Sequence, residues 1–102
     1  MKVIKETEFD SVVEKGITLV DFYATWCGPC RIMATILEDI EEELGEKVEI
    51  VKVDVDESSN LARRFGIMSI PTLLLYKDGQ QLEKHVGIWA ADDCINTIKS
   101  YQ

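Results

Sequence analysis

The chain lacks the features that mark several large classes of protein. It has only two prolines and six glycines in 102 residues and no low-complexity or linker-like stretch, so we expect one ordered domain over residues 1–102. No apolar run reaches the roughly 18 residues that cross a membrane. The first residues, 1–6, contain neither the apolar segment nor the small-residue cleavage site of a secretory signal. These absences predict a cytoplasmic protein without a membrane partner.

Basic residues and cysteines are also scarce. Eleven Lys and Arg stand against nineteen Asp and Glu, which gives a net charge of −8 and argues against nucleic acid or an anionic membrane as the main partner. Three cysteines are too few, and odd in number, for a disulfide scaffold. No nucleotide-binding motif is present, so we expect no bound cofactor. In a reducing compartment, two closely spaced cysteines more often serve catalysis or metal binding than structure.

Hydrophobic periodicity predicts alternating strands and helices. We expect strands at 3–4, 17–23, 48–55, 72–76 and 82–86, and helices at 8–15, 27–44, 58–65 and 91–101. Thr7 is the expected cap of the first helix, and Ser58 or Ser59 that of the third. Asp78-Gly79 predicts a tight hairpin, and the long helix between two strands predicts a right-handed parallel unit. The fold class is therefore α/β, with a mixed sheet of about five strands flanked by about four helices.

Cys27 and Cys30 carry the clearest chemical signal. At this spacing on a helix, Cβ atoms lie roughly 5–6 Å apart, and a disulfide needs about 3.5–4.5 Å, a gap that a loosened first turn can close. The pair can therefore cycle between dithiol and disulfide. Cys27 stands where the helix begins, so its thiolate is favoured as the nucleophile, and Cys30, one turn further in, suits the resolving role. Gly28 leaves space beside Cys27, and Pro29 is tolerated in a first helical turn.

A metal half-site is the alternative interpretation of this cysteine pair. Structural zinc takes four ligands, and the remaining candidates, Cys94 and His85, lie far along the chain on separate elements. Because the usual paired ligand spacings are absent, we expect no metal. Cys94 falls on an apolar helix stripe and predicts a buried thiol, with an intermolecular disulfide as the alternative. His85 is expected to be exposed and not catalytic.

Asp21 is a charged residue inside an apolar strand. If both faces of that strand are covered, the carboxyl is buried whichever way it points, and burial raises the pKa of a carboxyl. Asp21 precedes Cys27 by six residues at the carboxyl end of the strand, where ligand sites of such sheets lie. We therefore predict that Asp21 is an acid/base for the buried cysteine, the alternative being a carboxylate held by a structural bond. Lys52, in the next strand, is its candidate partner or else a surface lysine.

Two later features are less informative. Pro71 begins a strand, which is an ordinary place for proline, and the sequence leaves the isomer of the Ile70–Pro71 bond open. Trp89 lies between Gly87 and the last helix and is expected to be partly exposed.

These motifs together resemble the thioredoxin family along the whole chain. The resemblance rests on Val20-Asp21-Phe22, Trp26-Cys27-Gly28-Pro29-Cys30, Val53-Asp54, Phe65-Gly66-Ile67, Ile70-Pro71-Thr72-Leu73, Lys77-Asp78-Gly79 and Val86-Gly87. It implies the thioredoxin fold. Cys27 would be the exposed attacking cysteine and Cys30 the resolving one, with Asp21 as buried acid/base and Lys52 nearby.

The resemblance also implies a surface for the client protein. Pro71 would be a cis proline facing the disulfide, and the backbone at Ile70 would pair with an extended client segment. Gly87 would help to form a flat apolar rim around Cys27. The residues expected to contact the client are Trp26, Gly28, Pro29, Ile70, Pro71 and Gly87.

The implied activity is reduction of disulfides in client proteins, as a general electron donor and a monomer. A separate thioredoxin reductase, linked to a flavin or to ferredoxin, would restore the dithiol. The alternatives are a binding or chaperone module of the same fold, and a disulfide isomerase or oxidase. Three positions depart from the common family pattern: Thr35 replaces a helix-kinking proline, Tyr23 a tryptophan and Ser69 a glycine. None of them removes a catalytic group.

Overall fold

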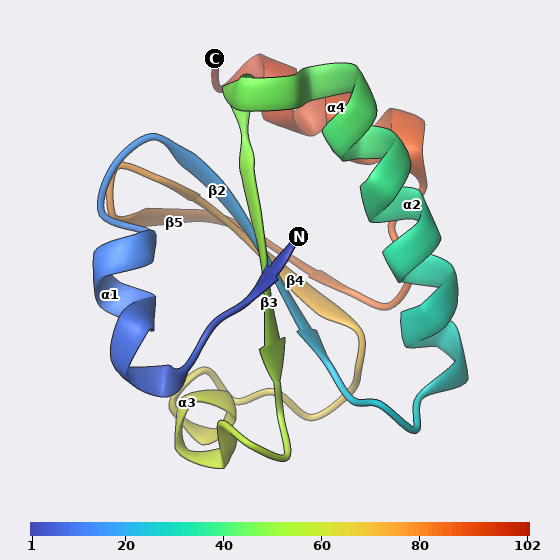
Figure 1. Ribbon diagram of the computed structural model, residues 1–102. Helices are drawn as coiled ribbons and strands as arrows, with labels where there is room; N and C mark the ends of the chain where they lie inside the picture. The colour runs from blue at the N-terminus through green and yellow to red at the C-terminus, as the bar shows by residue number, and fades with distance from the viewer.

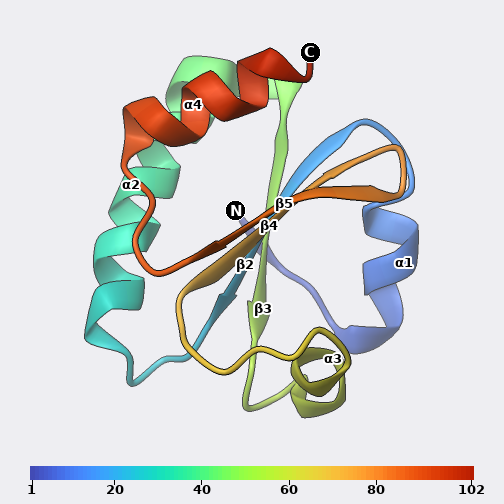
Figure 2. The same cartoon turned by 180° about the vertical axis from the view of Figure 1, so that it is seen from behind.

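The computed structural model describes all residues, 1–102, and has a five-stranded sheet flanked by four helices (Figures 1 and 2). The strands are β1 Lys2–Val3, β2 Ile17–Tyr23, β3 Glu49–Asp54, β4 Thr72–Lys77 and β5 Gln80–Val86. The helices are α1 Phe9–Val12, α2 Gly28–Leu44, α3 Ser59–Arg64 and α4 Ala91–Ser100, with 3₁₀ turns at Glu6–Glu8 and Gly45–Lys47. None of the helices is both long and apolar enough to cross a membrane.

The sheet is mixed, as predicted. Its strand order is β1-β3-β2-β4-β5, in which β1, β3 and β2 are parallel and β4 runs antiparallel to both of its neighbours, β2 and β5. The parallel pair of β2 and β3 is joined by α2, which confirms the predicted unit. Asp78 and Gly79 both have positive φ, at 49° and 83°, which is the backbone that a tight β4–β5 hairpin requires.

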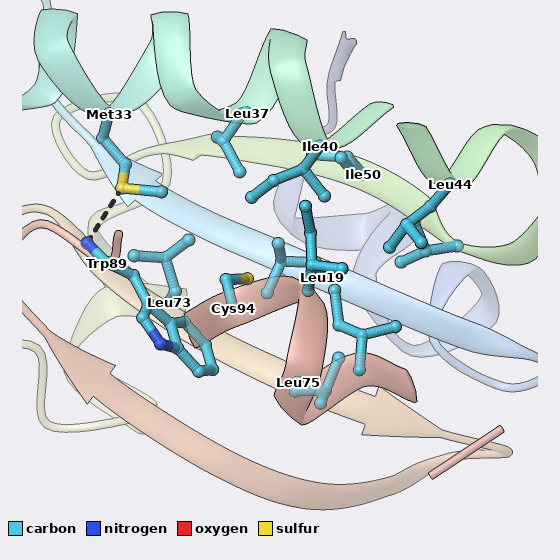
Figure 3. Packing of buried hydrophobic residues seen from close by; sticks show 13 residues of the cluster. Leu19, Met33, Leu37, Ile40, Leu44, Ile50, Leu73, Leu75, Trp89 and Cys94 are labelled. Carbon is cyan, nitrogen blue, oxygen red and sulfur yellow. Dashed lines mark hydrogen bonds between the residues drawn. The ribbon is translucent and has the colours of Figure 1, made fainter. Parts of the chain in front are cut away.

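Helices cover both faces of the sheet. α2 and α4 lie on one face and α1 and α3 on the other, as the two opposite views show. Residues of β2 alternate between the faces: Leu19 packs with α2 and α4, whereas Val20 and Phe22 pack with the α1 and α3 side. Figure 3 shows the first of these two clusters, with Met33 and Leu37 of α2 above Leu19.

The expectation of a partly exposed Trp89 is wrong. Its side chain is 6% exposed and belongs to the cluster beneath α2. Its ring stacks on His85 with centroids 4.7 Å apart, and its backbone N–H donates to the thioether of Met33 at 3.3 Å (Figure 3). His85 is correspondingly half-buried rather than exposed. This contact could not be predicted from the sequence because it joins residues from α2, β5 and the following loop.

The first helix is shorter than predicted. The expected helix over 8–15 is a 3₁₀ turn followed by α1, which ends at Val12. The carbonyl of Val13 accepts a hydrogen bond from Gly79 N–H at 2.8 Å, and Gly16 and Asp78 bond to each other. These bonds to the β4–β5 turn use the backbone groups that a longer helix would need. Thr7 makes no capping hydrogen bond; the Glu8 carboxylate accepts Lys5 N–H instead, at 2.8 Å.

The predicted side-chain cap of α3 is also wrong. Neither Ser58 nor Ser59 caps the helix with its side chain. The carboxylate of Glu6, more than fifty positions earlier, accepts the N–H groups of Asn60 and Leu61 at 2.8 and 3.1 Å. The remaining element boundaries differ from the predictions by two residues at most. α2 runs without interruption through Thr35.

Candidate active site

The cysteine pair lies at the start of α2. Cys27 is the N-cap residue of the helix, and Cys30 stands one turn in. The two form a disulfide with Cα atoms 5.3 Å apart, so the first turn accommodates the bridge that the spacing predicts. Pro29 occupies the first turn, where a missing N–H leaves no helical bond unmade.

The helix start favours negative charge on Cys27. The N–H of Cys30 donates to Cys27 Sγ at 3.2 Å, and no acidic residue stands in the first turn. This N–H donor and the positive end of the helix dipole both stabilise a thiolate. The position of Cys27 at the helix start therefore favours negative charge on its sulfur when the pair is reduced.

Cys27 is less exposed than the resemblance implied. In the disulfide form it is 5% exposed, against 3% for Cys30, so burial scarcely distinguishes the two. The cover comes from the loop before β4, whose Ile70 carbonyl oxygen lies 3.8 Å from Cys27 Sγ. Ala24 packs against both cysteines. The Ile70 backbone therefore lies directly beside the Cys27 sulfur.

The loop opposite the disulfide is built on a cis peptide bond between Ile70 and Pro71, as the resemblance implied. The carbonyl of Pro71 accepts the N–H of Gly87 at 2.8 Å, and Gly87 has a φ of +92° that favours glycine. This bond places the end of β5 beside the cis proline. The backbone N–H and C=O of Ile70 make no hydrogen bond to other backbone groups, so no strand of this chain pairs with them.

Trp26 stands out from the surface beside the disulfide. Its side chain is 67% exposed, and its indole N–H donates to the Asp56 carboxylate at 2.8 Å. Asp56 was missed in the sequence, although one signal pointed to it. It follows β3, whose carboxyl end lies next to that of β2, and side chains beyond neighbouring strand ends meet. The Asp54 carboxylate in turn accepts Asp56 N–H at 2.8 Å.

Asp21 is a buried carboxyl without a partner. It is completely inaccessible to solvent, and neither oxygen has a hydrogen-bond partner. Its neighbour on β4 is Leu73, a member of the cluster under α2, so Asp21 faces the side of the sheet that α2 covers. Burial raises the pKa of Asp21 to about 7, and the charge of Lys52 opposes that rise. A carboxyl that titrates near neutral pH is suited to both taking and giving a proton.

Lys52 lies opposite Asp21 in the β2–β3 register, as the predicted partnership requires, but it forms no ion pair with it. Its Nζ lies 4.1 Å from the centroid of the Tyr23 ring. Tyr23, Lys52 and Cys30 line a cavity of about 110 Å³ beside the first turn of α2. The sequence placed Tyr23 near the site but did not foresee this contact.

The other candidate ligands lie away from this site. Cys94 is fully buried in the α2–α4 core, where burial raises the pKa of its thiol to about 12. The His85 ring stacks on Trp89, and its Nε2 lies 3.0 Å from the Ile88 carbonyl oxygen. No cluster of three His, Cys, Asp or Glu side chains is placed to hold a metal ion.

Comparison with known proteins identifies the family. The family model described as Thioredoxin matches residues 1–100. The chain belongs to the thioredoxin family. It is 46% identical to the thioredoxin of Listeria monocytogenes over 101 residues, which cover 99% of this chain and 98% of the relative. It is 49% identical to the thioredoxin of Staphylococcus aureus over 103 residues, 99% of either chain.

Solved structures agree with this assignment. Mitochondrial thioredoxin 3 of Saccharomyces cerevisiae, in its oxidised form, superposes with a TM-score of 0.88 at 34% identity, covering 98% of this chain and 94% of that one. Chloroplastic thioredoxin z superposes at 0.90 with 28% identity, covering 98% and 92%. The chain therefore has the thioredoxin fold that the resemblance implied. With its redox-active cysteine pair, it is a thiol–disulfide oxidoreductase that reduces disulfides in client proteins and is recycled by a reductase.

Proposed function

We propose that the residues of this site divide the reductase reaction among them as follows. Cys27 is the nucleophile, Cys30 resolves, and Asp21 is the acid/base, with Lys52 adjusting its charge. The observation that carries the assignment is the placement of Cys27 as the N-cap of α2, where the Cys30 N–H already donates to its sulfur. A thiolate on Cys27 gains this bond and stands at the positive end of the helix dipole, whereas one on Cys30 has no such N–H donor.

The reaction starts from the dithiol form. The Cys27 thiolate attacks one sulfur of a client disulfide, a mixed disulfide forms, and the other client sulfur leaves as a thiolate. Cys30 then gives its proton to the Asp21 carboxylate and attacks Cys27 Sγ. The second client sulfur leaves, so the client gains two electrons and this chain keeps the Cys27–Cys30 disulfide. A reductase returns two electrons and the cycle repeats.

The client is held by an apolar rim and by backbone pairing. The rim consists of exposed apolar side chains on the segments around Cys27: Trp26, Met68, Val86 and Ile88. Gly28, Pro29 and Gly87 leave a low surface between them for a client chain. The N–H and C=O of Ile70, beside the cis Pro71, have no backbone partner, which supports pairing with an extended client segment in the manner of an added strand.

The proposal also covers the recycling enzyme, the oligomeric state and the cellular location of the protein. The recycling enzyme is a thioredoxin reductase, linked to a flavin or to ferredoxin, because this chain carries no nucleotide-binding motif of its own. Residues 1–102 act as one domain and as a monomer in the cytoplasm. The high negative charge of the chain supports its staying monomeric, since copies of it repel each other.

Reduction of insulin disulfides by dithiothreitol tests the assignment. The wild type accelerates the reaction, and we expect Cys27→Ser to abolish the acceleration because the attacking thiolate is gone. Cys94→Ala is the matched control, since it removes a thiol from the core and leaves the site intact. Wild-type rates from Cys27→Ser would refute the assignment of the nucleophile.

A further inference from the structure

Three polar side chains share one face of the sheet next to the cysteines. Asp21 and Tyr23 are two positions apart on β2 and therefore point the same way. Lys52 is paired with Asp21 across the β2–β3 register and lies on that face as well. It is the face that α2 covers, because Leu19, two positions before Asp21, packs with Met33 of α2 (Figure 3).

Lys52 is the neighbour of Asp21 in the sheet, but its ammonium group contacts a different residue. No ion pair joins them, and both carboxyl oxygens lack a hydrogen-bond partner. The ammonium instead lies 4.1 Å from the centroid of the Tyr23 ring. An aromatic face attracts a cation through its quadrupole, and partial burial strengthens that attraction. Tyr23 and Asp21 thus compete for the same cation.

The Lys52 side chain has space to change its position. It lines the cavity of about 110 Å³ together with Tyr23 and the first turn of α2, so the ammonium can move without displacing the core. The groups beside Asp21 in the sheet are Lys52 from β3 and Tyr23 from its own strand, while β4 contributes the apolar Leu73. From α2, Cys30 and the charged Arg31 line the same cavity as Lys52. The nearby acids Asp54, Glu57 and Asp21 act on the Tyr23 phenol.

We infer that Tyr23 is a positioning residue: its ring holds the Lys52 ammonium away from the Asp21 carboxyl and so preserves the proton-carrying role of that carboxyl. This inference rests on the proposed acid/base role of Asp21. A cation closer to the carboxylate would stabilise its charged form. Asp21 would then stay ionised at neutral pH and would hold the Cys30 proton less well during the resolving step.

The test is an NMR titration of the Asp21 carboxyl carbon in the oxidised protein. We expect Tyr23→Leu to lower the Asp21 midpoint by about one pH unit, because Lys52 is then free to approach. Tyr23→Phe keeps the ring and is expected to retain the wild-type midpoint. Lys52→Met removes the competing charge and raises the midpoint. If Tyr23→Leu does not fold, Tyr23→Ile serves instead, since a β-branched residue suits a strand.

A double-mutant cycle separates positioning from simple packing. In the Lys52→Met background, Tyr23→Leu should leave the Asp21 midpoint where Lys52→Met alone puts it, because there is no cation left to release. An equal fall in both backgrounds, or no fall in either, would overturn the inference. The titration involves no client, so its failure leaves the proposed function standing. Loss of the proposed function would instead be seen in the insulin assay of Cys27→Ser.

Discussion

At the scale of single residues, Asp21 is the most unusual feature of the molecule. A carboxyl with no exposure and no hydrogen-bond partner is costly to ionise, and proteins rarely keep such a group in a core position. Its register partner on β4 is Leu73, an apolar residue of the kind that usually fills such a position. Buried ionisable groups of this kind are enriched at functional sites, which is why we propose an acid/base role for Asp21.

Asp21 should make the stability of the oxidised protein depend on pH. Its pKa is about 7 in the folded protein and near the ordinary 3.8 when unfolded, so the folded state keeps a proton that the unfolded chain loses. The contribution of Asp21 to stability is then greatest below about pH 4, falls as the pH rises toward 7, and levels off above it. The full change is on the order of 4 kcal/mol.

Urea unfolding of oxidised protein at several pH values measures this change. The Asn side chain of Asp21→Asn does not titrate, so the free energy of unfolding of this variant should fall much less between pH 4 and 8. The variant therefore becomes more stable relative to the wild type as the pH rises. Asp39→Asn, an exposed carboxylate of α2, is the matched control and should follow the wild-type curve. Parallel curves for wild type and Asp21→Asn would show that Asp21 is ionised in the folded state.

The sequence was sufficient to predict the residues whose chemistry depends on local position. Cys27 and Cys30 follow from their spacing at a helix start, and Asp21 from being a charge within an apolar strand. Asp56 and the Tyr23–Lys52 contact were missed because their partners are set by which strands are neighbours. The burial of Trp89 was missed for the same reason: its contacts come from elements far apart in the chain.

At the scale of elements, the long β2, α2 and β4 were the easiest to predict and the short helices the hardest. α2 keeps an apolar stripe over seventeen residues and is recognisable from that pattern alone. α1 and α3 are too short to be fixed by their own sequences. Their lengths and ends are decided by tertiary hydrogen bonds, from the β4–β5 turn to Val13 and from Glu6 to α3.

The Glu6 cap can be compared directly with the cap expected at Thr7. Glu6→Ala leaves two N–H groups of α3 without their acceptor, and we expect it to lower the free energy of unfolding by about 1 kcal/mol. Thr7→Ala removes an exposed side chain with no hydrogen bond and should change it by less than about 0.5 kcal/mol. Urea unfolding measures both. Equal effects of the two substitutions would mean that the long-range cap contributes nothing.

At the scale of the whole molecule, two helical layers hold a sheet whose parallel strands end at the redox site. The carboxyl end of β2 leads to Trp26 and Cys27, and that of β3 leads to Asp56. The cis peptide bond before β4 and the end of β5 complete the site from the antiparallel side. The arrangement of strands therefore collects chemistry from four separate segments at one edge.

The net charge of −8 should act on clients before contact. We expect a disulfide peptide flanked by lysines to be reduced with a higher kcat/KM than one flanked by glutamates at low ionic strength. Raising the salt from about 20 mM to about 300 mM should bring the two values together, because the charges are then screened. Stopped-flow measurements with matched peptides give both values. A salt-independent ratio would indicate that only local contacts select the client.

Trapping the mixed-disulfide intermediate tests most directly whether Cys27 is the attacking cysteine. With Cys30→Ser, a client disulfide should give a stable mixed disulfide through Cys27, because the resolving thiol is absent and Cys94 is buried in the core. Mass spectrometry of the digested adduct identifies the linked residue. We expect an adduct on Cys27 in Cys30→Ser and almost none in Cys27→Ser. The reverse pattern, with Cys30 linked in Cys27→Ser, would contradict this expectation.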